Sequence, residues 1–441
     1  MVNKTILVVA TNREKHPCPV LPAGALQLTN ELIEIGEDAQ FLDLCFKENY
    51  MDIFKNTIIQ LKPSIVVFSV RNIDNETYLN TKFYLNEVKT YVSICRNVGN
   101  IKTIIGGIGF IVNYKAVYNF LNIDYGILDR GFNSIISLIK KLNNAQCIDN
   151  ITNLVYKKDG KLLINRTENC GKSISMIDWE YILNNCSPKY LKKDVNFKGP
   201  SSVGLQTKTG CRFQCIHCQI SQIEGIQITS YPYSYIIDTL KYFEANGIEE
   251  CFFTDNVFNY PYEHAYNLCQ KMLEAKIKIK WSCYLNPKYV DQNLINIMKK
   301  AGCTSAQFGI DTASDKLLKL WRKGFTSKDI INAGEICVKE NLNCSFSLIV
   351  GGWGEDEETL KESLNILSSA KAKFIWGALG VRVQLRTGLY KILLEKKIIK
   401  ENDDLLKPQF YLSPQIKDKY SEIVQAFENE NPQIIVKINE V

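Results

Sequence analysis

The sequence predicts an α/β protein in which a doubly wound parallel sheet is followed by a partial barrel of six strand–helix units. Two observations support this prediction. Short apolar runs alternate with helical patterns along residues 1–145, and six further strand candidates alternate with helical stretches along residues 201–390. Such alternation is typical of parallel sheets covered by helices. The 441 residues are enough for two or three domains of roughly 150 residues each.

The first 145 residues carry five short apolar segments that read as strands. These expected strands are Ile6–Ala10, Ala39–Asp43, Ser64–Ser69, Thr103–Ile105 and Asp124–Ile127, with helices at Gly24–Ile35 and from about Glu76 to Arg96. Ligands of doubly wound sheets bind at the carboxyl ends of the strands, so we expect ligand contacts in the loops there. Residues 146–200 predict a connector that contains a hairpin with Asp159-Gly160 at its turn.

The second domain repeats the strand–helix unit. Its expected strands are Val203–Gln206, Cys251–Thr254, Ile277–Cys283, Ser305–Ile310, Cys344–Val350 and Ile375–Gln384. The clearest helices are Tyr262–Ala275, a helix opened by a capping box at Thr326 and Asp329, and Glu355–Lys371. In barrels of this type the active site lies at the carboxyl ends of the strands. We expect residues 391–441 to form a segment that covers the site.

Three cysteines directly after the first strand of this domain carry the main chemical signal. Cys211, Cys215 and Cys218 have the spacing Cys-x₃-Cys-x₂-Cys. Thiolates are the usual protein ligands of iron–sulfur clusters, and three of them can hold three irons of a four-iron cluster and leave the fourth iron open. Structural zinc needs four ligands, and a second Cys-x₂-Cys pair is absent. A zinc-bearing, non-catalytic binding module and buried inert thiols stay open as alternatives.

The composition is that of an ordinary globular protein. Hydrophobic residues make up 46% and charged residues 23% of the chain, and the formal net charge is +6. No dense basic block stands out, so nucleic acid is not expected as a partner. We find no run of about 18 apolar residues and no signal peptide. Together with 15 cysteines, this predicts a protein of the reducing cytoplasm with no membrane partner. An oxygen-sensitive iron–sulfur cluster would also suit anaerobic conditions.

The cysteine spacing and the order of the domains resemble the cobalamin-binding radical S-adenosylmethionine (SAM) enzymes over roughly residues 1–390. Pro19-Val-Leu-Pro-Ala-Gly24 is similar to the first loop of that family, and Gly106-Gly-Ile-Gly109 to its glycine loop. The resemblance implies a 4Fe-4S cluster on the three cysteines, SAM on the open iron and cobalamin on the first domain. The cobalamin contacts that it implies are Pro22, Gly24, Arg71, Asn72, Gly107, Gly109 and Gly131.

Two departures from the family pattern concern cobalamin. The motif Asp-x-His-x-x-Gly is absent, so a histidine of this motif is not expected as the lower ligand. The family often has Gly-Glu-Gly-Glu after the fifth strand, where this chain has Leu128-Asp-Arg-Gly-Phe-Asn133. Gly131 is kept and the acidic residues are changed.

Four motifs at strand ends of the second domain resemble the SAM contacts of the family. Asp255 and Asn256 would face the amino group, because an oxygen ligand suits an ammonium. The remaining implied contacts are Gly309 and Asp311 near the ribose or the methionyl part, Val350 and Gly351 along the adenine, and His217 near the adenine. Arg382 and Arg386 could hold an anionic group, or form ordinary ion pairs.

The resemblance implies an enzyme that methylates an unactivated carbon of a small metabolite or natural-product intermediate. Methylcobalamin would supply the methyl group, and a 5′-deoxyadenosyl radical from SAM would remove a hydrogen atom. An electron donor such as flavodoxin or ferredoxin is the expected protein partner. A cyclase or rearrangement enzyme that uses the same cofactors without methyl transfer is the alternative within this family.

Overall fold

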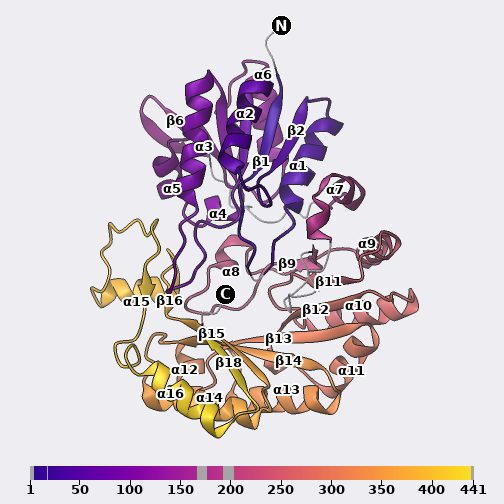
Figure 1. The fold of residues 1–441 in the computed structure, drawn as a ribbon, viewed down its shortest axis with the longest axis vertical. Helices are drawn as coiled ribbons and strands as arrows, with labels where there is room; N and C mark the ends of the chain where they lie inside the picture. The colour runs from indigo at the N-terminus through magenta and orange to yellow at the C-terminus, as the bar shows by residue number, and fades with distance from the viewer. Residues whose placement is uncertain (1–3, 17, 166–175, 192–202, 439–441) are drawn as a thin grey trace. The chain divides into compact units, whose positions relative to one another are not determined.

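The computed structural model describes residues 4–16, 18–165, 176–191 and 203–438 (Figure 1). These residues form two compact units. The first unit contains the described residues up to Leu191 except 76–81, together with residues 404–407. The second unit contains residues 76–81, 203–403 and 408–438. Within the described residues, no helix is long and apolar enough to cross a membrane.

The first unit is built on a seven-stranded sheet with the strand order β2-β1-β3-β4-β5-β6-β7. Its strands are β1 (Ile6–Ala10), β2 (Ala39–Asp43), β3 (Ile65–Ser69), β4 (Lys102–Gly106), β5 (Tyr125–Ile127), β6 (Leu154–Lys158) and β7 (Lys161–Ile164). The first five strands pair in parallel, which confirms the predicted doubly wound sheet. The hairpin β6–β7 forms as predicted, and β6 pairs with β5 in antiparallel direction. The hairpin of the expected connector therefore extends this sheet.

Helices cover both faces of the first sheet. They are α1 (Ala23–Glu34), α2 (Tyr50–Leu61), α3 (Leu85–Val98), α4 (Ile108–Ile111), α5 (Tyr114–Leu121), α6 (Asn133–Asn143) and α7 (Trp179–Asn185). One apolar cluster joins the sheet to α2, α3 and α5, and includes Phe54, Phe68 and Tyr91. A second cluster joins the opposite face to α1 and α6. Consecutive residues of β1 and β3 are buried. Because strand side chains alternate between the two faces of a sheet, both faces of these strands are covered.

The predicted helix from Glu76 to Arg96 is wrong in its first part, because α3 begins only at Leu85. The preceding residues form a loop, in which Glu76 and Asn80 have positive φ angles of 52° and 58°. A bridge between Asp74 and Phe83 closes the loop at its base. The backbone groups at the base thus bond across the loop, which competes with the hydrogen bonds of a helix turn.

The second unit contains another seven-stranded sheet, with the order β18-β15-β14-β13-β12-β11-β8. Its strands are β8 (Gly204–Leu205), β11 (Glu250–Phe253), β12 (Lys280–Leu285), β13 (Cys303–Asp311), β14 (Asn343–Val350), β15 (Phe374–Leu379) and β18 (Ile435–Ile438). All neighbours in this sheet pair in parallel. The six predicted strands occur in the predicted order, and β18 from the C-terminal segment adds a seventh.

The helices of the second unit are α8 (Ile220–Ile223), α9 (Tyr233–Ala245), α10 (Tyr262–Glu274), α11 (Gln292–Lys300), α12 (Asp315–Leu320), α13 (Ser327–Lys339), α14 (Glu357–Ser369), α15 (Gly388–Glu395) and α16 (Tyr420–Glu430). Of these, α11, α13, α14 and α16 lie along one side of the sheet (Figure 1). The predicted capping box of α13 is confirmed, with both of its hydrogen bonds between Thr326 and Asp329. Two short antiparallel pairs, β9 (Lys208–Thr209) with β10 (Thr229–Ser230) and β16 (Val381–Arg382) with β17 (Phe410–Tyr411), flank the strand ends.

Candidate cluster and cofactor site

The loop that carries the three cysteines runs from β9 to α8 and is tied to its surroundings by backbone hydrogen bonds. The Cys211 N–H donates to Gly225 O at 3.0 Å, and the Ile216 N–H donates to Trp321 O at 3.1 Å. Gly210 precedes the first cysteine with φ of +95°, and a Cβ atom there would lie 2.1 Å from Gln227 O. Only glycine can lie this close to the backbone of Gln227. The conformation at the start of the loop therefore requires glycine at position 210.

The three cysteines are half-buried, and burial raises the pKa of each thiol. The pKa of Cys218 rises to about 12. A metal that binds these thiols must therefore displace their protons, which is a general property of thiolate sites. Soft thiolates at this spacing are suited to iron–sulfur clusters, so the donor set fits a cluster.

The described residues contain no group of three or more His, Cys, Asp or Glu side chains that could hold one metal ion. This finding concerns a single ion, around which all ligands converge on one centre. In a four-iron cluster each thiolate binds a different iron, so its ligands stand further apart.

Asp311, at the end of β13, contacts His217, which lies within the cysteine loop between Cys215 and Cys218. His217 Nε2 is 3.0 Å from Asp311 Oδ2. The His217 ring also meets Trp321 edge to face, at 6.1 Å between centroids. Asp311 ends β13 with a φ of +64°, which is uncommon for a residue other than glycine. The structure thus brings these two predicted residues together, and a bulge in the pairing of β13 with β14 accompanies the turn.

Lys323 joins this pair and was not predicted from the sequence. Its Nζ lies 2.5 Å from Asp311 Oδ2 and 2.9 Å from the carbonyl oxygen of the predicted residue Gly309. The Lys323 ammonium also opposes part of the effect of burial on Cys215, which raises the pKa of that thiol. Burial alone would raise the pKa of Asp311, but Lys323 and His217 hold it below its usual range. Lys323 therefore places a buried positive charge beside the Asp311 carboxylate at the end of β13.

Asp255 follows β11 and is buried, with 1% of its surface exposed. Its Oδ1 accepts hydrogen bonds from the backbone N–H groups of Thr207 and Lys208, and its Oδ2 from their side chains. The carboxylate is thus engaged by four donors of the protein and ties β11 to the strand end before the cysteine loop. These bonds already use both oxygens of the Asp255 carboxylate, so they do not favour a contact with SAM. That contact stays a prediction.

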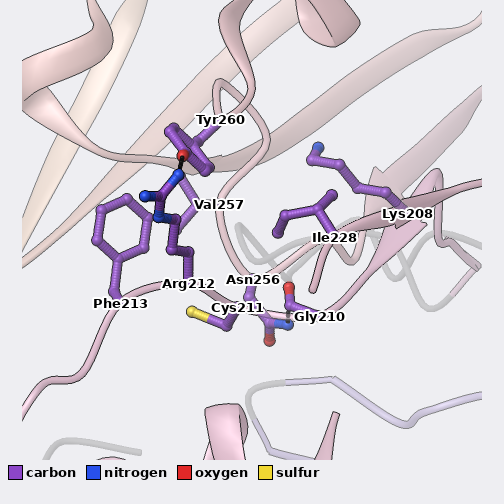
Figure 2. Close-up of a pocket in the computed structure, with 9 residues that line it drawn as sticks. All are labelled: Lys208, Gly210, Cys211, Arg212, Phe213, Ile228, Asn256, Val257 and Tyr260. Atoms are coloured by element: carbon purple, nitrogen blue, oxygen red, sulfur yellow. Dashed lines mark hydrogen bonds between the residues drawn. The ribbon is translucent and has the colours of Figure 1, made fainter. Parts of the chain in front are cut away.

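Asn256, the next residue, lies nearer to the cysteines. It lines a pocket together with Cys211. Figure 2 shows the two side chains next to each other among the nine residues that line this pocket, which are Lys208, Gly210, Cys211, Arg212, Phe213, Ile228, Asn256, Val257 and Tyr260. Asn256 Nδ2 donates to Glu224 Oε2 at 2.7 Å. Of the two residues predicted to face an ammonium, Asn256 is the one placed beside a cysteine.

Val350 and Gly351 end β14, where the sequence predicts contacts along the adenine. Their backbone groups are used within the protein, because Val350 O accepts from Gly380 N and Gly351 O accepts from Ser413 N, both at 2.7 Å. The Gly351 N–H donates to the side chain of Glu355, which is 2% exposed. These backbone groups already make hydrogen bonds within the protein, so we expect Val350 and Gly351 to contact a ligand through van der Waals packing.

Arg382 and Arg386, which the sequence offered as anion contacts, lie near the end of β15. Arg382 is 6% exposed and donates from Nη1 to Val383 O at 2.8 Å. Arg386 has a positive φ of 66°, and its carbonyl oxygen accepts a hydrogen bond from Gln222. The first side chain is therefore held in the interior, whereas the role of the second stays a prediction.

In the first unit, two predicted glycines lie after β4 against the end of β3. A Cβ atom at Gly107 would be 2.4 Å from Val70 O, and one at Gly109 would be 2.8 Å from Val70 Cγ1. Both glycines are required for close packing on Val70. Arg71 follows directly, and its Nη1 pairs with the amide oxygen of Asn72 at 3.2 Å.

The remaining residues predicted to contact cobalamin also lie after strands of this sheet. Pro22 is the N-cap of α1, and Gly24 stands in its first turn, where a Cβ atom would meet nothing within 4 Å. The Gly131 N–H donates to Asp129 Oδ1 at 3.1 Å. The carboxyl edge of the first sheet therefore carries all seven of these residues, with open space beside Gly24.

Comparison with known proteins finds a family model that matches part of the chain. Residues 205–367 match the model of the radical SAM superfamily. This match contains the three cysteines and the ends of β11, β13 and β14.

Among proteins of known name, the chain is similar to the tryptophan 2-C-methyltransferase of Streptomyces laurentii, with 21% identity over 90% of this chain and 76% of that protein. The radical SAM methyltransferase TsrM from Kitasatospora setae, solved with cobalamin and a 4Fe-4S cluster, has a TM-score of 0.82 at 18% identity, and covers 99% of this chain and 93% of that chain. A second structure of TsrM holds tryptophan substrate and a SAM analogue.

The cobalamin-dependent radical SAM enzyme OxsB, solved with aqua-cobalamin and SAM, has a TM-score of 0.65 at 16% identity. It covers 98% of this chain, whereas this chain spans 62% of OxsB. At these identities the likenesses show the fold. They confirm the predicted class, in which a parallel sheet like that of cobalamin-binding proteins precedes the sheet of a radical SAM domain.

Proposed function

Because residues 205–367 belong to the radical SAM superfamily, we propose that this protein is a cobalamin-dependent radical SAM methyltransferase that acts on a carbon atom of a small molecule. One observation carries the proposal. The cysteine loop lies in the same unit as the carboxyl ends of β11 and β13, and the side chains of Asn256, His217 and Asp311 are arranged around it.

The cysteines would hold a 4Fe-4S cluster, which when bound supplies the electron that cleaves SAM. Cys211, Cys215 and Cys218 provide three ligands from a single loop, so one iron is left for SAM. Lys323 balances part of the negative charge that three thiolates bring together. The Asn256 amide offers an oxygen to the SAM ammonium, and Asp311, fixed by Lys323 and His217, offers the remaining acceptor at the end of β13.

The first unit would bind cobalamin, which when bound supplies the methyl group. The loops after β1, β3, β4 and β5 would border the ring with Gly24, Arg71, Asn72 and Gly131. The close packing of Gly107 and Gly109 on Val70 holds the loop after β4 against the end of β3. A larger residue at either position would force this loop away from β3. The protein part of this function is to bind and orient the cofactor and to exclude water.

The substrate would be a small molecule, as in the relative solved with tryptophan. An aromatic amino acid or a derivative of one is the first compound class to test. A low-potential electron donor such as flavodoxin or ferredoxin would reduce the cluster.

The experiment that tests the proposal is anaerobic production with hydroxocobalamin, followed by reconstitution with iron and sulfide. We expect about four irons per chain, as for the cluster type, a retained corrin and release of S-adenosylhomocysteine when a substrate is methylated. Cys215→Ala should lose the cluster, whereas Cys147→Ala, at an exposed cysteine, should keep it. One bound zinc without visible absorption would contradict the proposal. Release of 5′-deoxyadenosine without S-adenosylhomocysteine would point to rearrangement instead.

A further inference from the structure

Glu224 is a buried carboxylate that lies beside the cysteine loop without belonging to any motif found in the sequence. It follows the four-residue helix α8 and is 8% exposed. Its Oε2 accepts hydrogen bonds from the Gly210 N–H at 3.0 Å and from Asn256 Nδ2 at 2.7 Å. One oxygen atom thus joins the start of the cysteine loop to the end of β11.

This contact fixes the direction of the Asn256 amide. A carboxylate can only accept hydrogen bonds, so Asn256 must present its nitrogen to Glu224 and its oxygen to the other side. No hydrogen bond among the described residues uses Asn256 Oδ1. Asn256 and Cys211 line the same pocket, and Oδ1 is the polar atom of the Asn256 side chain that the described residues leave unused, so it can accept a hydrogen bond from a ligand.

We propose that Glu224 is a positioning residue, which holds the oxygen of Asn256 toward the pocket beside Cys211 as the acceptor for the ammonium of bound SAM. This inference rests on the proposed function. Without Glu224 the amide can turn by half a rotation and present its N–H₂ group, which repels an ammonium. The Glu224 carboxylate does not contact the ligand itself and acts through Asn256.

A double-mutant cycle tests whether Glu224 acts through Asn256. The measurement is the dissociation constant of SAM for reconstituted protein, by equilibrium dialysis, with iron content and melting temperature recorded for each variant. We expect Glu224→Ala and Asn256→Ala each to weaken SAM binding about tenfold, as for one lost hydrogen bond to a charged group. The double variant should bind SAM no more weakly than Asn256→Ala alone. Glu263→Gln, at an exposed acid on α10, is the matched control and should bind normally.

An exchange of the two groups keeps the test independent of folding losses. Asn256→Asp alone places two carboxylates in contact and should weaken SAM binding. Adding Glu224→Gln removes the contact between two carboxylates and offers the new carboxylate at position 256 a donor, so the pair Glu224→Gln with Asn256→Asp should bind SAM more tightly than Asn256→Asp alone. Failure of this recovery, or an equal effect of Glu224→Ala in both backgrounds, would overturn the inference. Wild-type protein that assembles no cluster, or binds no SAM, would instead overturn the proposed function.

Discussion

Lys323 Nζ and Asp311 Oδ2 form an ion pair of 2.5 Å beside the cysteine loop, in which the exposed fractions of the side chains are 7% and 17%. The two residues come from neighbouring elements, since Asp311 ends β13 and Lys323 follows α12. Burial alone would lower the pKa of Lys323, but Asp311 and the cysteine thiols raise it above its usual range. Both groups are therefore charged at neutral pH.

Lys323→Met should destabilise the protein by about 3 kcal/mol, because it leaves a buried carboxylate without its main partner. Urea unfolding of the metal-free protein measures this loss. Lys271→Met is the matched control, since Lys271 pairs with Glu274 on the surface and such pairs contribute less than about 1 kcal/mol. Equal effects of the two substitutions would show that the ion pair at Asp311 contributes no more than a surface pair.

Asp255→Asn should destabilise the protein even when no cofactor is present. All four groups around the carboxylate are donors, and an amide nitrogen would face two of them. We expect a loss of about 3 kcal/mol or more in the free energy of unfolding, measured without SAM or iron. Asp238→Asn, at an exposed position of α9, should change stability little. Normal stability together with weakened SAM binding would restore the cofactor role that the sequence predicts for Asp255.

Gly210→Ala should prevent assembly of the cluster. The added Cβ atom would lie 2.1 Å from Gln227 O, so the loop must shift before Cys211. Gly247→Ala is a matched control, because Gly247 also has a positive φ, of +74°, but open space around it. The control should lose about 1 kcal/mol of stability and bind iron normally. Iron per chain after reconstitution distinguishes the two variants, and full iron binding by Gly210→Ala would show that the loop tolerates the shift.

Glu355→Gln should change how stability depends on pH. Burial raises the pKa of Glu355 to about 8, although the N–H groups of Gly351 and Gly352 act in the opposite direction. The ordinary pKa is 4.5, so between about pH 4.5 and pH 8 the unfolded chain has released a proton that the folded protein keeps. The wild-type protein therefore loses stability as pH rises through this window.

Glutamine has no proton to lose, so the stability of Glu355→Gln relative to wild type should increase across the same window, by about 5 kcal/mol at most. Urea unfolding at several pH values measures the difference. Glu358→Gln, at an exposed position of α14, should show no such trend. A constant difference for Glu355→Gln would mean that the two backbone donors already hold the buried group as a carboxylate.

The sequence predicts those parts of the site whose residues are close together in the chain or directly follow successive strands. The three cysteines share one loop, and Asn256 and Asp311 directly follow apolar strand segments, so their position at one edge of the sheet follows from alternation alone. The capping box at Thr326 is likewise a pattern of four residues. In each case the interacting groups are close in the chain or lie at equivalent points of a repeat.

Lys323 and Glu224 could not be predicted because their roles depend on packing between distant segments. Lys323 reaches Asp311 only because α12 ends with Trp321 buried against the cysteine loop. A lysine in the sequence is otherwise most simply a surface residue. Glu224 meets Asn256 across 32 residues of chain, and no spacing rule links them. The late start of α3 has the same origin, since the bridge between Asp74 and Phe83 is a contact across a loop.

The first unit includes a short piece of chain from far downstream. Leu406 is buried in its apolar cluster, and Asn113 Nδ2 donates to Asp404 O at 2.7 Å. A gene fragment that stops after the first sheet would therefore encode an incomplete body, with an uncovered apolar patch where that leucine belongs. Dissection of this protein into separately expressed halves calls for grafting residues 404–407 onto the upstream fragment, or for supplying them as a peptide in trans.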